Sequence, residues 1–151
     1  SGIAPVKRFL EEGIPVAIGT DGPASNNCLD MFREMFLVSG LAKVREQDAL
    51  CIPAEEVLSM ATVEGAHAMG LWECDALEEG KLADLIMIDL KQPNMQPENH
   101  FVKNIVYSGS KQNVRLTMVD GNILYEDQKF FIGTDPNEVY RRANEIIRRM
   151  Q

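Results

Sequence analysis

The residue with the clearest chemical potential is Asp21, a carboxylate that follows the apolar run of residues 14–20 and lies between Gly19 and Gly22. A continuous apolar run bounded by turn residues is typical of a parallel strand that is buried on both faces. In parallel α/β architectures the chemistry gathers at the carboxyl ends of strands, where the loops open. Asp21 is therefore the candidate site residue. The alternative is that it only caps a turn or the following helix.

The loop that follows Asp21, residues 22–28, is polar and rich in turn-forming residues. It lies where a ligand of Asp21 would be found. Ser25 and Asn27 are its candidates for substrate contact, with Asn26 between them, and the alternative is that all three only shape the turn.

The pattern of the first half of the chain predicts helices around this one strand. Apolar residues recur at helical spacing in residues 5–12, 29–45 and 53–69. Gly13 and Gly70 suit the ends of the first and last of these helices. The predicted local order is helix, then buried strand, then helices that cover it.

The second half of the chain is predicted to be rich in β-strands. Residues 82–90 form a long apolar β-type run, residues 105–107 are a short strand candidate, and apolar and polar residues alternate in residues 114–119. Asp120-Gly121 is the strongest short hairpin signal. Asp135 and Pro136 then predict the start of a final helix.

Composition limits the classes of partner and site. The 151 residues carry 15 Lys and Arg against 23 Asp and Glu, a formal net charge of −8, which disfavours nucleic acid as a partner. No apolar stretch approaches the length of a membrane span. The 3 cysteines form no Cys-x-x-Cys pair, so a structural zinc or a disulfide framework has no support, and reduced cysteines predict a cytoplasmic protein. The absence of an initiator methionine points to a fragment or a processed chain.

Several motifs, in order along nearly the whole chain, resemble the amidohydrolase superfamily. Within it, the chain is most similar to the branch of 5-methylthioadenosine/S-adenosylhomocysteine deaminases and chlorohydrolase-type enzymes. The matching residues are 1–5, 19–27, 29–31, Ala61-Thr62, Gly65-Ala66, Gly70-Leu71, 77–85 and 119–121.

The resemblance implies an α/β fold that is a fragment of a larger one. Residues 1–76 would be the carboxyl-terminal part of a (β/α)8 barrel, with residues 15–20 as its last strand and outer helices after it. Residues 77–133 would be the carboxyl-terminal strands of a small β-sandwich, and residues 134–151 a carboxyl-terminal helix.

The resemblance also implies a divalent metal, zinc or iron, in the full-length enzyme. The family's ligands are histidines of earlier strands and an aspartate that ends the last strand, and Asp21 is that aspartate by motif. His67 and His100, the only histidines, match no ligand position. We therefore expect Asp21 to serve as metal ligand and acid-base residue in the full-length enzyme, and no firmly bound metal in this chain alone.

The function implied is hydrolytic deamination of a nucleoside-type or heterocyclic amine, with a small-molecule substrate. Two alternatives stay open: a chlorohydrolase or cyclic-amide hydrolase of the same superfamily, and a non-enzymatic α+β binding or oligomerisation module. Because a lone last strand has lost both barrel neighbours, we expect the chain by itself to be inactive and to form homo-oligomers.

Overall fold

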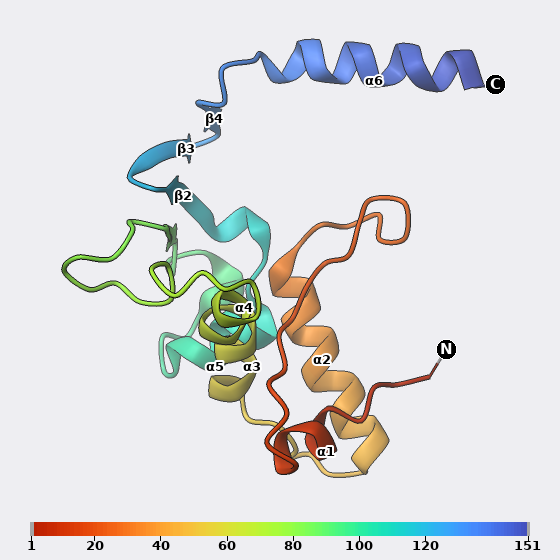
Figure 1. The fold of residues 1–151 in the computed structure, drawn as a ribbon, viewed down its shortest axis with the longest axis vertical. Helices are drawn as coiled ribbons and strands as arrows, with labels where there is room; N and C mark the ends of the chain where they lie inside the picture. Colours follow the sequence, from red (N-terminus) through yellow and green to blue (C-terminus); the bar gives the residue numbers. More distant parts are fainter. Residues whose placement is uncertain (1, 151) are drawn as a thin grey trace.

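A computed structural model of the chain describes residues 2–150. Figure 1 shows a helical body, a small sheet above it and a last helix that extends away from both. The helices are α1 (Val6–Glu11), α2 (Met31–Glu46), α3 (Ala54–Ala61), α4 (Val63–Ala68), α5 (Phe101–Ser108) and α6 (Pro136–Met150). The strands are β1 (Leu85–Ile88), β2 (Val114–Val119), β3 (Asn122–Glu126) and β4 (Lys129–Phe130), with 3-10 turns at Pro93–Met95 and Lys111–Asn113.

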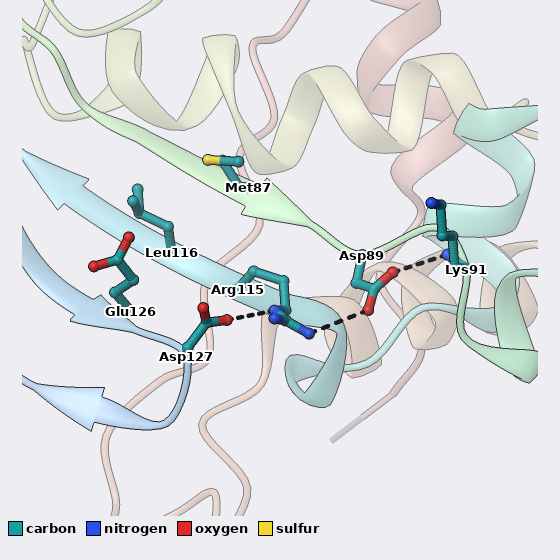
Figure 2. A pocket seen from close by; sticks show the side chains of 7 residues that line it. All are labelled: Met87, Asp89, Lys91, Arg115, Leu116, Glu126 and Asp127. Atoms are coloured by element: carbon teal, nitrogen blue, oxygen red, sulfur yellow. Dashed lines mark hydrogen bonds and ion pairs between the residues drawn. The ribbon is translucent and has the colours of Figure 1, made fainter.

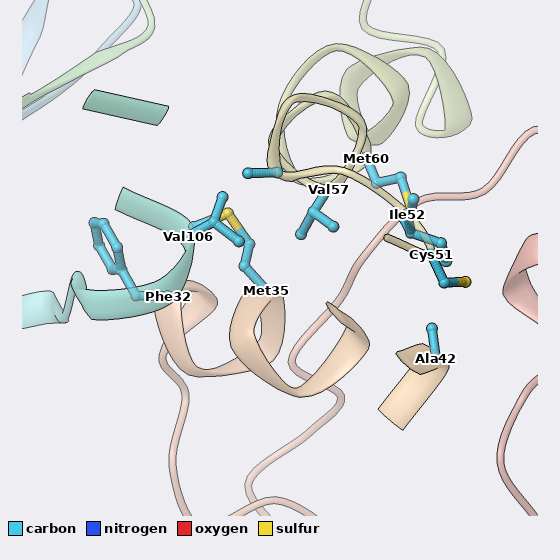
Figure 3. Close-up of a cluster of buried hydrophobic side chains, with 9 residues drawn as sticks. Phe32, Met35, Ala42, Cys51, Ile52, Val57, Met60 and Val106 are labelled. Carbon is cyan, nitrogen blue, oxygen red and sulfur yellow. The ribbon is translucent and has the colours of Figure 1, made fainter. Parts of the chain in front are cut away.

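The core lies where α2, α3 and α5 pack together, and Figure 3 shows the side chains that meet there. Val57, Met60 and Val106 are completely shielded from solvent. The other buried members of the cluster are Phe32, Met35, Ala42, Cys51, Ile52 and Ala54. Because apolar burial is the main favourable term in folding, this cluster anchors the helices on which the candidate site depends.

Residues 14–20 run as an extended segment beside the helical body (Figure 1), but they pair with no strand among residues 2–150. One backbone bond ties the segment to α3, from the amide of Ile18 to the carbonyl of Met60 at 3.1 Å. Val16 and Ile18 pack against the core, whereas Ile14 is exposed. The prediction of burial on both faces is therefore wrong for this chain, because only one side has a neighbour to cover it.

The helix predicted over residues 53–69 is divided into α3 and α4 at Thr62. The Thr62 hydroxyl donates to the carbonyl of Leu58 at 2.8 Å, and its backbone leaves the helical region at φ −124° and ψ −90°. A hydroxyl that bonds four residues back competes with the helix and often bends it. The predicted stop is confirmed, since Gly70 takes a φ of +72° directly after the last turn.

The strand candidate at residues 105–107 is wrong, because these residues belong to α5. β-branched and aromatic residues favour strands only weakly when tertiary contacts decide otherwise. Val106 is fully buried between α2 and α3, and Val102 and Ile105 pack beside it at helical spacing. Burial on this one face therefore overrides the local β preference.

The sheet has the order β1-β2-β3-β4, and every neighbouring pair is antiparallel. The predicted hairpin is confirmed between β2 and β3, where Asp120 and Gly121 both take positive φ, 48° and 73°. Positive φ at both central positions is the requirement of the tight turn that Asp-Gly favours. β1 is confirmed within the predicted run, while the short β4 was not predicted.

The final helix begins as predicted, with the Asp135 carboxylate accepting the backbone N–H of Asn137 at 3.0 Å. None of its residues is buried, and in Figure 1 it projects from the sheet into solvent. Among the helices of residues 2–150, none combines the length and the apolar character needed to cross a membrane.

Candidate functional site

Asp21 lies at the end of the extended segment, at the start of the loop that leads to α2. Its φ of 57° is in the left-handed region, which residues other than glycine rarely adopt. The carboxylate is held by its own loop: Oδ1 accepts the N–H of Gly22 at 2.7 Å and Oδ2 accepts the hydroxyl of Ser25 at 2.6 Å. Asp21 therefore stabilises its own turn through these two hydrogen bonds, as expected if it only capped the turn.

These bonds favour the charged form of Asp21. The Ser25 hydroxyl, followed by the Gly22 amide, lowers the pKa of the Asp21 carboxyl below its ordinary value of 3.8. Each carboxylate oxygen has two acceptor sites, so one donor on each leaves capacity for a further ligand. The side chain is exposed, and an ionised oxygen donor at neutral pH is a suitable ligand for a divalent cation.

The two substrate-loop candidates differ in their surroundings. The Ser25 hydroxyl lies 3.2 Å from the carbonyl of Gly22, in addition to its bond to Asp21. Ser25 therefore lies within direct reach of any group bound at Asp21. Asn27 is exposed on the same loop.

Asn26, which lies between the two candidates, makes the most extensive contacts of the loop. Its side-chain amide donates to the carbonyl of Thr20 at 2.7 Å and to Oε1 of Glu34 at 2.8 Å, and its oxygen accepts the N–H of Cys28 at 3.0 Å. Asn26 therefore connects the residue before Asp21 to the first turn of α2. The only signal in the sequence was an amide residue in a turn-rich loop, which is too common to predict these three hydrogen bonds.

A complete metal site is not formed by these residues. Residues 2–150 contain no group of three or more His, Cys, Asp or Glu side chains placed to hold a metal ion. His67 binds Asp75, with Nε2 2.8 Å from Oδ2, and His100 caps α5 by accepting the N–H of Lys103 at 3.4 Å. The donor set thus fits one ligand of a metal, Asp21, and the remaining ligands would have to come from outside residues 2–150.

The sheet carries a separate surface pocket, which Figure 2 shows. Arg115 projects between two carboxylates, 2.5 Å from Asp127 and 3.5 Å from Asp89. Those two carboxylates raise the pKa of the Arg115 guanidinium, with Asp127 as the larger cause. Since its charge is already paired, Arg115 ties Asp89, which follows β1, to Asp127, which follows β3, and we assign this pocket no role in the chemistry of Asp21.

The chain is similar in sequence to known deaminases. It is 42% identical over 152 residues to the 5-methylthioadenosine/S-adenosylhomocysteine deaminase of Dictyoglomus thermophilum, covering 99% of this chain and 36% of that protein. The chain therefore spans about a third of the length of the curated relatives it matches.

Several solved structures share its fold. An adenosine deaminase from Xanthomonas campestris with bound zinc superposes with a TM-score of 0.93 at 33% identity, covering 99% of this chain and 34% of that one. The atrazine chlorohydrolase TrzN from Arthrobacter aurescens, complexed with zinc, superposes with a TM-score of 0.87 at 25% identity, covering 97% and 32%.

A family model, the amidohydrolase family, matches residues 1–124. That match includes the extended segment, Asp21 with its loop, the helical body and most of the sheet. The chain belongs to the amidohydrolase family.

Proposed function

We propose that this chain is the carboxyl-terminal part of a metal-dependent hydrolase that removes an amine from a nucleoside-type or heterocyclic substrate. The observation that carries the proposal is the Asp21 carboxylate, ionised, exposed and held at the end of the extended segment by Gly22 and Ser25. Membership of the amidohydrolase family and similarity to named deaminases support the reaction class.

The proposed organisation explains why a single carboxylate stands alone. Residues 1–76 would complete a barrel of which residues 15–20 form the last strand, residues 77–133 would belong to a β-sandwich, and residues 134–151 would form the terminal helix. The exposed side of residues 14–20 is consistent with a neighbouring strand in a larger barrel. The chain matches only about a third of each relative's length, which is consistent with a longer protein.

The chemistry assigns Asp21 two tasks, metal ligation and proton transfer. A divalent metal, zinc by similarity to the zinc-bound neighbours, supplies an acidic water when it is bound. Asp21 would contribute one ligand oxygen, accept a proton from the attacking water and deliver a proton to the leaving amine. Water adds to the carbon, the carbon–nitrogen bond breaks, and ammonia leaves as the ring carbon becomes a carbonyl.

A second substrate class within the same family has a specific observation in its favour. The similarity to an atrazine chlorohydrolase supports a chloride leaving group, for which water attack is the same and no proton needs to be delivered to an amine. A cyclic-amide substrate and a non-enzymatic module remain the further alternatives. We also propose a cytoplasmic location, with neither nucleic acid nor membrane as a partner, in keeping with the net charge of −8.

The test is a paired assay on the full-length protein, wild type and Asp21→Asn, with zinc and 5-methylthioadenosine as substrate. The amide is nearly isosteric but lacks the charge, so turnover should fall at least about 10²-fold, as expected when a positioned acid-base group is lost. Zinc content should fall as well. The isolated 151-residue chain should release no ammonia.

Full turnover by Asp21→Asn would contradict the catalytic assignment. Release of chloride from a chlorotriazine, with no ammonia from the nucleoside, would favour the chlorohydrolase instead. Zinc-dependent deamination by the isolated chain would show that ligands outside residues 1–151 are unnecessary.

A further inference from the structure

We infer that Asn26 and Glu34 form a clamp that positions Asp21 for its role, acting through the peptide group between Thr20 and Asp21. The clamp consists of the Asn26 side-chain amide, the carbonyl of Thr20 and the carboxylate of Glu34. The inference rests on the proposed function of Asp21. It adds two positioning residues, neither of which touches substrate.

The orientation of the Asn26 amide is fixed by its surroundings. Its nitrogen lies 2.7 Å from the Thr20 carbonyl and 2.8 Å from Glu34 Oε1, and both of these groups can only accept. Its oxygen lies 3.0 Å from the Cys28 N–H, which can only donate. A flipped amide would face acceptors with its oxygen and a donor with its nitrogen, so only one orientation satisfies all three partners.

Glu34 ties this amide to the core. It lies in the first turn of α2, and its neighbours Phe32 and Met35 are buried in the main cluster. Asp30 caps the same helix end, accepting the N–H of Phe32 at 3.0 Å. The carboxylate acceptor makes the hydrogen bond from Asn26 charge-assisted. The Glu34 side chain is half-buried, so water screens this bond only partly.

Asp21 needs such a hold because its own conformation is unfavourable. A φ of 57° is strained for a residue other than glycine, and it persists only where the surroundings impose it. The bonds from Gly22 and Ser25 fix the carboxylate within the loop but not the loop against the body. The Asn26 bond to the Thr20 carbonyl fixes the peptide plane that sets φ of Asp21, and Glu34 ties that plane to α2.

A simpler role must be separated from positioning, namely that Asn26 only ties the loop to α2. Asn26→Asp keeps the size and the acceptor for Cys28 but removes both donors, so a carboxylate would face the Thr20 carbonyl and Glu34. The double variant Asn26→Asp/Glu34→Gln leaves the net charge unchanged and restores the tie, because the new amide on α2 can donate to the new carboxylate in the loop. It cannot restore a donor to Thr20.

The kinetic test uses the full-length protein with zinc and 5-methylthioadenosine. Asn26→Asp should lower kcat about 10²-fold with KM little changed, as expected when a reacting group is displaced by about an ångström. The double variant should stay equally slow. The matched control is Asn99→Asp, the same change on an exposed loop, and it should keep wild-type kcat. Wild-type kcat in Asn26→Asp, or recovery in the double variant, would overturn the inference.

Hydrogen exchange measured by mass spectrometry on the same proteins tests the clamp without activity. Peptides that contain residues 20–24 should exchange faster in Asn26→Asp and in the double variant, but not in Asn99→Asp. Unchanged exchange in both would overturn the clamp. If Asp21→Asn retains full turnover, the proposed function fails, and the exchange result alone then decides the clamp.

Discussion

At the scale of single residues, Gly109, directly after α5, has the least room for a side chain among the glycines of residues 2–150. A Cβ there would collide with the carbonyl oxygen of Ile105 and lie 2.7 Å from Cδ1 of Phe32. Both neighbours belong to packed helices, so neither can yield cheaply. We expect Gly109→Ala to lower the free energy of unfolding by about 1–3 kcal/mol, the usual cost of overpacking a core. Urea denaturation of the 151-residue chain measures it.

The matched control is the same substitution at Gly40, in the middle of α2. No heavy atom lies within 4 Å of a Cβ built there, and Ala is favoured over Gly in a helix interior by about 1 kcal/mol. Gly40→Ala should therefore raise the free energy of unfolding. Equal stability of the two variants would show that α5 does not approach α2 as closely as described.

Asp21 could be found from the sequence, whereas its clamp could not. An apolar run that ends in a carboxylate between glycines is a local pattern, visible within residues 14–22. Asn26 acquires its role only when the loop folds back, since its partners Thr20 and Glu34 lie six residues before it and eight residues after it. The left-handed φ of Asp21 also depends on that closure. The assignment of Asp21 as a metal ligand stays a prediction.

At the scale of elements, an ionic cluster joins α4 to the segment that follows it. Nε2 of His67 lies 2.8 Å from Asp75 Oδ2, Lys81 binds the other oxygen of Asp75, and the ring of Trp72 stacks on His67 with centroids 4.2 Å apart. Lys81, followed by His67, lowers the pKa of the Asp75 carboxyl from 3.8 to about 2. The sequence did not reveal this cluster, because Asp75 lies eight residues after His67, beyond the spacing of one helical turn.

The lowered pKa of Asp75 makes a prediction about stability and pH. A carboxyl whose pKa is lower in the folded state than its ordinary 3.8 contributes stability above that value and loses it as pH falls toward about 2. Asp75→Asn should therefore lower the melting temperature at pH 7, and the difference from wild type should shrink between pH 4 and about pH 2. Thermal unfolding followed by circular dichroism over this range measures it.

The matched control for Asp75 is Asp120→Asn in the hairpin. In the part of the chain that the structure describes, the Asp120 side chain makes no hydrogen bond, and its positive φ of 48° suits Asn equally well. Its melting temperature should follow that of wild type at every pH. A destabilisation of Asp75→Asn that persists unchanged at about pH 2 would contradict an ionic origin.

Element prediction succeeded where the signal was local. Asp120-Gly121 specifies its turn by backbone angles alone, and Asp135 with Pro136 specifies a helix start in the same way. It failed at residues 105–107, where burial of Val106 against α2 and α3 decides the structure. It also missed the break at Thr62, because a side-chain hydroxyl that bonds backward leaves no periodic signature.

At the scale of the whole molecule, the chain exposes many large apolar side chains, and two helical surfaces carry several of them. The first lies on and before α2, where Leu29, Phe36 and Val44 are 51%, 53% and 70% exposed. The second is the apolar stripe of α6, formed by Val139, Ala143, Ile146, Ile147 and Met150. Isolated helices shorter than about 12–15 residues are marginal in water, and tertiary packing of an apolar face supplies most helix stability. α6 has 15 residues and none of them is buried, so its apolar stripe has no packing partner among residues 2–150.

We therefore predict that the 151-residue chain forms dimers or larger species and that the α6 stripe contributes to the contact. Ile146 and Ile147 are 55% and 54% exposed, so burying them against another copy would remove apolar surface from water. Ile146→Glu/Ile147→Glu should shift the mass measured by light scattering toward the monomer over a dilution series. Asn144→Glu/Arg148→Gln makes the same change in net charge on the polar face of the helix, so it should leave the association intact. A monomeric wild-type chain at every concentration would refute the prediction, and equal dissociation by both variants would assign the effect to charge alone.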